Sequence, residues 1–181
     1  MNKTLLSAAL VATLGALAFV PAAQAATTNT GTIQINGKVL QDTCTVTVNG
    51  SGNTVTLTPV MVSSLAASGA KAGATAFTLN LSNCDANATQ AQLSFTSGAN
   101  NASDGNLKNS TSTGSAGNVE VQLLAGGTSG SVINVSSNTN APAVSLSSGS
   151  GSTNMAAQYY ATGVATAGLV STSASVTFTY Q

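Results

Sequence analysis

Short segments in which apolar and polar residues alternate recur along this chain of 181 residues, and they limit its fold more than any other feature. A period of two places successive side chains on opposite faces of a β-strand. The segments lie near positions 33–39, 46–48, 55–57, 77–81, 93–95, 119–123 and 176–180; positions 132–135 follow the pattern less cleanly, and Tyr159 lies in a run from Met155 to Thr162. Clusters rich in Gly, Asn and Ser separate several of them, at 49–53, 97–105, 110–118, 126–130 and 147–154. This pattern predicts an all-β sandwich, in which only Val60–Ala72 could form a helical turn.

The chain is poor in charge, with four lysines, four acidic residues and no His. A net charge of zero offers no basic surface for nucleic acid or for an anionic membrane. Without His, the commonest general base and metal ligand is missing. Each acid stands alone in its segment; the four are Asp42, Asp85, Asp104 and Glu120. We therefore expect no catalytic residue, no metal site and no cofactor, and we do not expect an enzyme.

The first 25 residues have the pattern of a secretory signal peptide. Lys3 supplies a positive start, Leu5–Val20 is apolar, and Ala23-Gln24-Ala25 fits the small-x-small cleavage pattern. A membrane anchor is the alternative, but the apolar run is shorter than the ~20 residues that a spanning helix needs. We expect export and cleavage after Ala25.

The two cysteines, Cys44 and Cys84, are 40 positions apart. In an exported chain a lone pair is most simply one disulfide bond, and a loop of this size would stabilise the fold by roughly 3–4 kcal/mol. A metal-binding pair or a reactive thiol is the alternative, and zinc is disfavoured because no His is present. The expected bond joins the strand after Cys44 to the end of the Phe77–Leu81 strand.

The C-terminal residues Ala174–Gln181 alternate strictly up to the terminus, with Val176, Phe178 and Tyr180 on one face. A second regular segment, near the N-terminus, has Ile33, Ile35, Gly37 and Val39 on one face. Two interpretations of this second segment are open. Asn36-Gly37 favours a type I′ hairpin turn, whereas the alternation favours one extended strand.

Taken together, these features resemble the chaperone–usher fimbrial subunits, the type-1-like major pilins. The marks are the signal peptide, the Gly-x-Ile-x-Ile-x-Gly-x-Val segment five residues before Cys44, and the pair Cys44 and Cys84. Further along come Tyr160-Ala161-Thr162-Gly163, then Ala167-Gly168, and the strand with its penultimate Tyr180. Their order and spacing cover essentially the whole chain.

The resemblance implies an incomplete immunoglobulin-like sandwich that lacks its last strand. It divides the chain into a signal peptide (1–25), a donor-strand extension (26–39) and a pilin body (40–181). In such a subunit a periplasmic chaperone binds the C-terminal strand, here Val176, Phe178 and Tyr180. At an outer-membrane usher, the extension of the next subunit replaces the chaperone strand. Its groove-facing residues here are Ile33, Ile35, Gly37 and Val39.

The function implied is that of a structural subunit of a surface fimbria that supports cell adhesion. Its partners would be identical or related pilins, the chaperone, the usher and, through the fibre, a host surface receptor. Two alternatives stay open, a secreted self-complete sandwich that acts as a binding module, and a minor adhesive or adaptor subunit.

Overall fold

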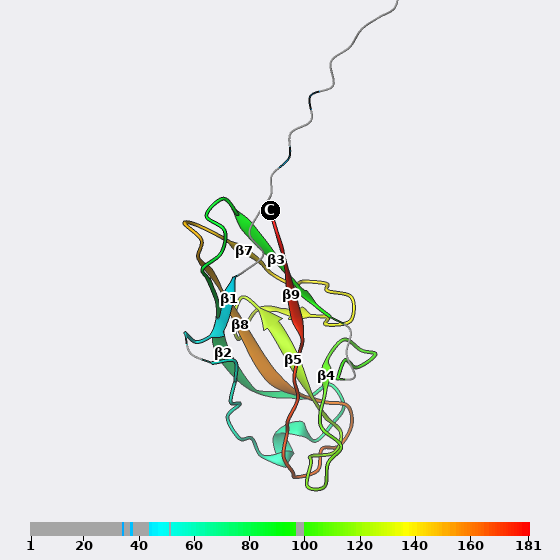
Figure 1. The fold of residues 1–181 in the computed structure, drawn as a ribbon. Coiled ribbons are helices and arrows are strands. Elements are labelled where there is room, and N and C mark those ends of the chain that lie inside the picture. The colour runs from blue at the N-terminus through cyan, green and yellow to red at the C-terminus, as the bar shows by residue number, and fades with distance from the viewer. Residues whose placement is uncertain (1–33, 35–36, 38–43, 51, 97–99) are drawn as a thin grey trace, which may run out of the picture. The chain divides into compact units, whose positions relative to one another are not determined.

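The computed structural model describes residues 34, 37, 44–50, 52–96 and 100–181 of the chain. Its described residues form nine strands and one 3-10 turn (Figure 1). In chain order these are β1 (Thr45–Val48), η1 (Val62–Leu65), β2 (Lys71–Ser82), β3 (Gln90–Phe95), β4 (Leu107–Lys108), β5 (Val119–Ala125), β6 (Ser131–Ile133), β7 (Ala143–Ser145), β8 (Gly151–Ala161) and β9 (Val176–Tyr180). The all-β expectation is confirmed.

The strands form two antiparallel sheets. The larger sheet has the order β1-β2-β8-β5-β4, with β6 also paired to β5, and the smaller sheet has the order β7-β3-β9. Apolar side chains from both sheets meet in one core, so the two sheets form the layers of a sandwich. Within the described residues β1 and β9 each pair with one neighbour, which places them at sheet edges.

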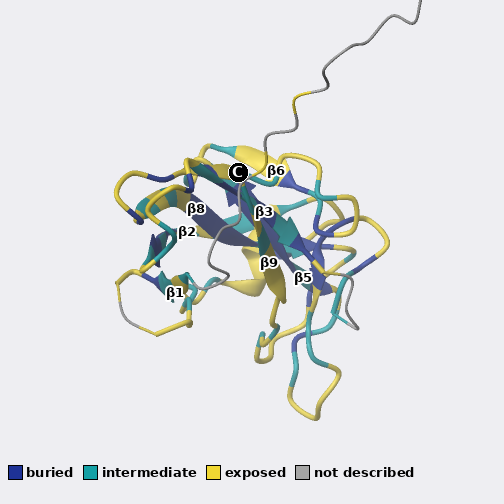
Figure 2. Ribbon diagram, turned by 45° about the horizontal axis from the view of Figure 1, so that its top comes forward, coloured by how far each residue is buried: buried dark blue, intermediate teal, exposed yellow. Residues whose placement is uncertain are grey.

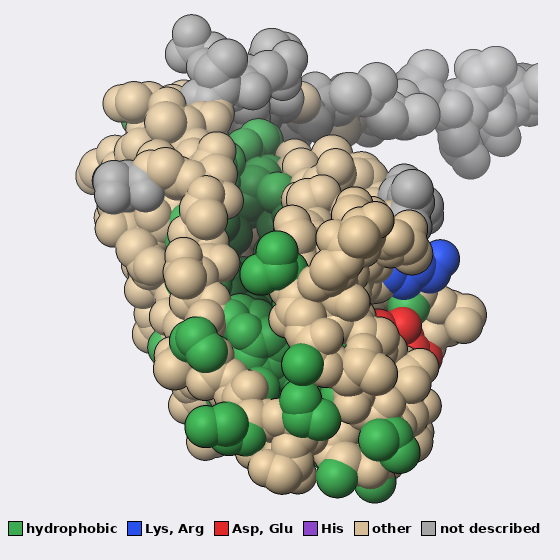
Figure 3. Space-filling view, turned by 90° about the horizontal axis from the view of Figure 1, so that it is seen from below, with side chains coloured by type: hydrophobic (Ala, Val, Ile, Leu, Met, Phe, Trp, Pro, Cys, Tyr) green, Lys and Arg blue, Asp and Glu red, His purple; other side chains and the backbone are tan. Residues whose placement is uncertain are grey.

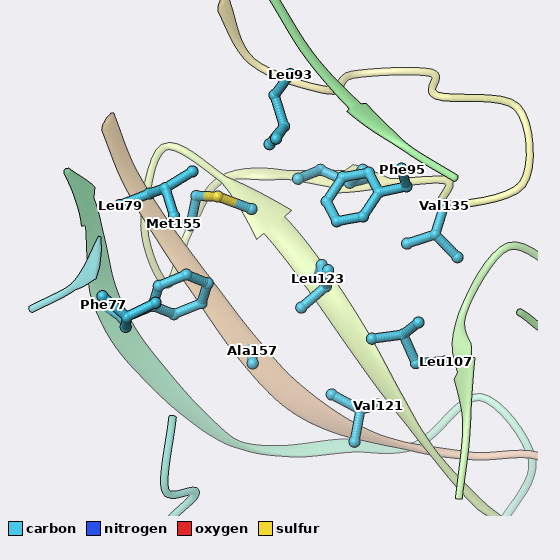
Figure 4. Packing of buried hydrophobic residues seen from close by; sticks show 12 residues of the cluster. Phe77, Leu79, Leu93, Phe95, Leu107, Val121, Leu123, Val135, Met155 and Ala157 are labelled. Atoms are coloured by element: carbon cyan, nitrogen blue, oxygen red, sulfur yellow. The ribbon is translucent and has the colours of Figure 1, made fainter. Parts of the chain in front are cut away.

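The core lies between the sheets and is built from the inward residues of each alternating segment (Figure 2). Leu93 and Phe95 reach from β3 toward side chains of β5 and β8, among them Leu123 and Met155 (Figure 4). Leu93, Met155 and Phe95 are 1%, 2% and 5% exposed. The period of two in the sequence thus selects the face that is buried.

The turn expected at Ser147–Asn154 ends earlier than expected, because β8 already begins at Gly151. Residues 151–154 pair with residues 78–81 of β2, and this ladder outweighs their turn-like composition. Gly151 is required there, since a β-carbon would collide with the carbonyl of Ser145. A non-local contact therefore decides the start of this strand.

Two further expectations were partly wrong. Val55 and Leu57 were expected in a strand, but residues 54–61 are irregular, although both side chains still pack against the core. The helical turn expected over Val60–Ala72 covers only η1, and β2 begins at Lys71. Gly73, with φ +64°, lies at a register shift in β2 where a β-carbon would be 2.8 Å from Val60.

The expected signal peptide, Met1–Ala25, lies outside the described residues. In the part of the chain that the structure describes, no helix is long and apolar enough to cross a membrane.

Candidate functional site

Cys44 and Cys84 form the expected disulfide bond, with an S–S distance of 1.98 Å. Cys44 immediately precedes β1 and Cys84 lies two residues after the end of β2, beside the first pair of their ladder, Thr45 and Ser82. Both cysteines pack against a small apolar cluster that Tyr180 also contacts. The bond thus fixes the start of edge strand β1 at the end of the sandwich where β9 finishes.

The free edge of β9 has a defined backbone pattern. Gln181 and Gln90 exchange two hydrogen bonds, of 2.9 and 3.2 Å. Hydrogen-bonded and non-hydrogen-bonded pairs alternate along an antiparallel ladder, and Phe178 is opposite Leu93. The N–H and C=O groups of Val176 and Phe178 therefore point away from β3. They face the open side of the sheet.

The side chains on this strand cover the core only in part. Phe178 and Tyr180 are half-buried and pack against the apolar clusters, whereas Val176 is 37% exposed. Thr177 and Thr179 are exposed on the opposite face. The predicted apolar face of Val176, Phe178 and Tyr180 is therefore the face turned toward the core.

The other side of the core is also incompletely covered. Half-buried apolar side chains from β1, from the irregular segment after it and from the segment before β9 pack against the same core as Phe178; they are Val46, Val55, Leu57 and Val170. Because β1 and β9 lie at the edges of different sheets, no backbone ladder joins these two described strands. Among the described residues, the core is therefore bordered by two strands, β1 and β9, that have no further partner at their outer edges.

A hollow of about 410 Å³ lies at the end of the sandwich opposite the disulfide bond. Its walls come from residues 59–62 and 165–170, together with Leu65, Ala116, Val119 and Tyr159. No charged residue lines it. Burial raises the pKa of the Tyr159 phenol, as expected for an apolar surrounding. Figure 3 views this end and shows hydrophobic side chains inside a central hollow and around its rim.

The predicted donor residues Ile33, Ile35 and Val39 lie outside the described residues. Gly37 is described, is exposed, and has no other atom within 4 Å of the place that a β-carbon would occupy. The assignment of this segment as a strand for a neighbour, or as a hairpin at Asn36-Gly37, stays a prediction.

Two of the acids that stand alone in the sequence meet in space. The side-chain nitrogen of Asn106 donates to Asp104 at 2.9 Å and to Glu120 at 3.2 Å. Its oxygen accepts from Gln122 at 3.0 Å, and Gln122 in turn accepts from Gln158 at 2.8 Å. The three amide side chains are buried, so this polar chain is satisfied inside the protein.

The pKa of the Glu120 carboxyl is raised, first by its burial and then by neighbouring Asp104, while Asn106 and Lys108 act to lower it. In the described residues no three His, Cys, Asp or Glu side chains lie close enough together to hold a metal ion. The arrangement is thus a carboxyl pair held by one amide.

Sequence reasoning missed the hollow, and a signal for it was present. Residues 59–62 are four consecutive apolar residues outside any alternating segment, and Leu169-Val170 form a second apolar pair. Neither group fits a strand with one buried face, so both indicate apolar surface that is available for an interaction.

The comparisons with known proteins agree on one family. A family model described as fimbrial protein matches residues 33–181. The F17 fimbrial protein of Escherichia coli is 40% identical over 158 residues, which cover 83% of this chain and 87% of that protein. The type-1 fimbrial protein A chain of Escherichia coli K12 is 34% identical over 88% of each. The major fimbrial subunit SMF-1 of Stenotrophomonas maltophilia is 38% identical, over 83% of this chain and 92% of that protein.

Two solved structures support the fold. The P pilus rod subunit PapA aligns with a TM-score of 0.56 at 19% identity, over 76% of this chain and 99% of that chain. A chain from a chaperone–usher pilus aligns with a TM-score of 0.55 at 20% identity, over 84% of this chain and 96% of that chain.

Proposed function

The chain belongs to the fimbrial protein family, and from this premise we propose that it polymerises by accepting an extended segment of a neighbouring subunit along the open edge of β9. The protein is a structural subunit of an extracellular fimbrium, as its relatives are, and it polymerises with related pilins.

The edge of β9 is the observation that carries the proposal. Val176 and Phe178 turn backbone groups outward, and Phe178 packs its side chain against the core, so an added strand would gain a ladder and cover the core in one step. An open edge over an incompletely covered core is also an aggregation hazard. Such an edge favours a subunit in which another strand always covers β9, first from a chaperone and then from a neighbouring subunit.

The segment that fits this edge is Ala26–Val39 of a second copy, the donor arm. Burial of Ile33, Ile35 and Val39 would contribute roughly 1.5–3 kcal/mol each. Ordering a flexible arm opposes this by about 1–2 kcal/mol per residue. Side chains alone therefore do not hold the arm, and the backbone ladder and the closure of the acceptor core must supply the rest.

We assign the first partner of the edge to a periplasmic chaperone and the site of exchange to an outer-membrane usher. The chaperone strand would bind along Val176, Phe178 and Tyr180, where the donor arm later binds. Removal of Ser175–Gln181 should abolish chaperone capture in the periplasm. A truncated chain that still co-purifies with the chaperone at normal yield would contradict this assignment.

Two matched substitutions in the arm test the proposed donor strand. Gly37→Leu should slow or stop fibre assembly, because an added side chain on the groove face costs about 1–3 kcal/mol or more. Asn36→Thr should have little effect, because residue 36 points away from the groove in an extended strand. Both variants should still fold and bind the chaperone. Normal assembly of Gly37→Leu together with misfolding of Asn36→Thr would instead support the hairpin, since a β-branched residue resists positive φ.

A further inference from the structure

Four large apolar side chains are exposed on the loops that form the hollow, and we call them the apolar rim. Three of them line the hollow, and the fourth, Val164, precedes Ala165, which also lines it. Met61 is 76% exposed, Leu169 74%, Val164 66% and Val62 42%. The other exposed large apolar side chains of the described residues are Val132 and Val176, each at 37%. Isolated apolar residues are normal on a surface, but a contiguous group marks an interaction site.

The apolar rim is held by defined hydrogen bonds. The N–H of Ala165 donates to the carbonyl of Leu65 at 3.1 Å, which links the two loops that carry the rim. The side chain of Asn118 donates to the carbonyl of Val164 at 2.9 Å. Ala116 and Leu169 are joined by a backbone bond of 2.9 Å. The rim residues are therefore exposed from fixed loops.

The surroundings of the rim suit an apolar partner. Met61, Val62 and Leu169 also line the uncharged hollow. The charged side chains visible from this end lie to one side of the view (Figure 3). A basic or acidic partner would find no counter-charge in the hollow.

We propose that the apolar rim seats the body of the subunit whose donor arm occupies the groove, with the disulfide end of that subunit placed against the rim. This inference rests on the proposed function. It goes beyond the groove, because it adds a second contact between successive bodies.

The length of the chain limits where the donor body can lie. Five residue steps separate Val39, the last donor residue, from Cys44, where the body begins. Fully extended, these steps span about 18 Å at most. The donor body must therefore touch or nearly touch whichever end of the acceptor its arm leaves.

The direction of the arm decides which end that is. Cys44 and Tyr180 pack against one cluster, so the described part of the body begins at the end where β9 finishes, five residues after the last residue of its own arm. A donor arm parallel to β9 would bring the donor body to this same end and crowd it against the acceptor's own arm. An antiparallel arm brings the donor body to the end where β9 begins. Val176 is seven residues after Leu169 of the apolar rim, and all the paired strands in the described sheets are antiparallel.

The test separates the rim from the groove with two measurements. The double variant Met61→Ser with Leu169→Ser removes the two most exposed rim side chains, and Val132→Ser on β6 is the matched control. The first measurement is the binding of a synthetic peptide of residues 26–39 to each subunit. The second is the rate at which subunits leave assembled fibres in urea. Circular dichroism checks that each variant is folded.

We expect the double variant to bind the peptide as the wild type does, within twofold. We expect its fibres to lose subunits at least about tenfold faster, since burial of even one large apolar side chain changes a binding constant by about tenfold or more. Fibres of Val132→Ser should match the wild type. Unchanged fibre dissociation in the double variant would overturn the inference, and so would a parallel loss of peptide binding. Failure of the wild type to bind the peptide would instead overturn the proposed groove.

A photo-crosslinking residue at position 61 gives a second measurement that does not depend on stability. In assembled fibres it should link to the neighbouring body near Cys44 and Cys84. A crosslink that maps to another region of the neighbour would overturn the assigned occupant.

Discussion

Strands β8 and β9 both turn apolar residues toward the core, yet those of β8 are buried and those of β9 are only partly covered. β8 lies between β2 and β5, and Met155, Ala156 and Ala157 are at most 4% exposed. Within the described residues β9 has β3 on one side only, and its inward side chains are half-buried at best. The difference teaches that the number of paired neighbours, and not the pattern alone, decides how far a strand is closed.

The largest effect should come from freeing β1, the other edge strand. Replacing both Cys44 and Cys84 by Ala should lower the free energy of unfolding by about 4 kcal/mol, because the unfolded chain regains the freedom of a long loop. Urea denaturation of the mature protein measures this. A loss below about 1 kcal/mol would mean that the strand ladder with β2 already fixes β1 and that the chain-entropy estimate does not apply here.

Strand β8, which has a neighbour on each side, should be equally sensitive to a core substitution whether or not the donor-arm peptide is bound. Met155→Ala should cost about 3 kcal/mol, since it leaves a cavity in a core that cannot easily collapse. The loss should be the same in the free subunit and in the subunit bound to the donor-arm peptide, because β8 already has both neighbours. A loss of unfolding free energy that differs between the free and the peptide-bound subunit would contradict this prediction.

The open strand should be sensitive mainly when its groove is filled. Phe178→Ala should cost about 2 kcal/mol in the free subunit, where the ring is half-buried, and about 3 kcal/mol with the peptide bound. Denaturation with and without the peptide gives both values. Equal losses in the two states would show that nothing is added over β9.

The smallest effect concerns pH and the carboxyl pair beside β8. Burial raises the pKa of Glu120, so the folded state holds this proton more tightly than the unfolded state does. Its stabilising contribution is complete below the ordinary glutamate pKa and is lost as the pH rises through the raised value. The wild type should therefore gain stability from this group as the pH falls through the raised pKa toward the ordinary glutamate value of 4.5. Glu120→Gln should show a flatter dependence in urea denaturation, and an unchanged slope would contradict the assignment.

The sequence predicted the features that depend on neighbours along the chain. Alternation gave the strands around Phe77, Leu93 and Val121, and it gave the inward face of Val176, Phe178 and Tyr180. The Cys44–Cys84 bond followed from an exported chain with two cysteines. The order of these marks was enough to predict the family.

Short or polar strands could not be predicted, because their own residues do not specify them. Leu107–Lys108 is too short for a period to appear, and Ala143–Ser145 forms a strand only because β3 provides a ladder. Gly151–Asn154 has the composition of a turn but extends β8 along β2. In each case a partner distant in sequence supplies the hydrogen bonds.

What the sequence determined by itself is therefore the set of strands with one buried face, the covalent bond and the family. The tertiary structure decided which strands have two neighbours and which have one, and it brought Asp104 beside Glu120 and Met61 onto the same hollow as Leu169. The physical reason is that alternation along a strand records only which face of the strand is apolar. The neighbours that cover that side, or leave it open for another chain, come from contacts between residues far apart in sequence.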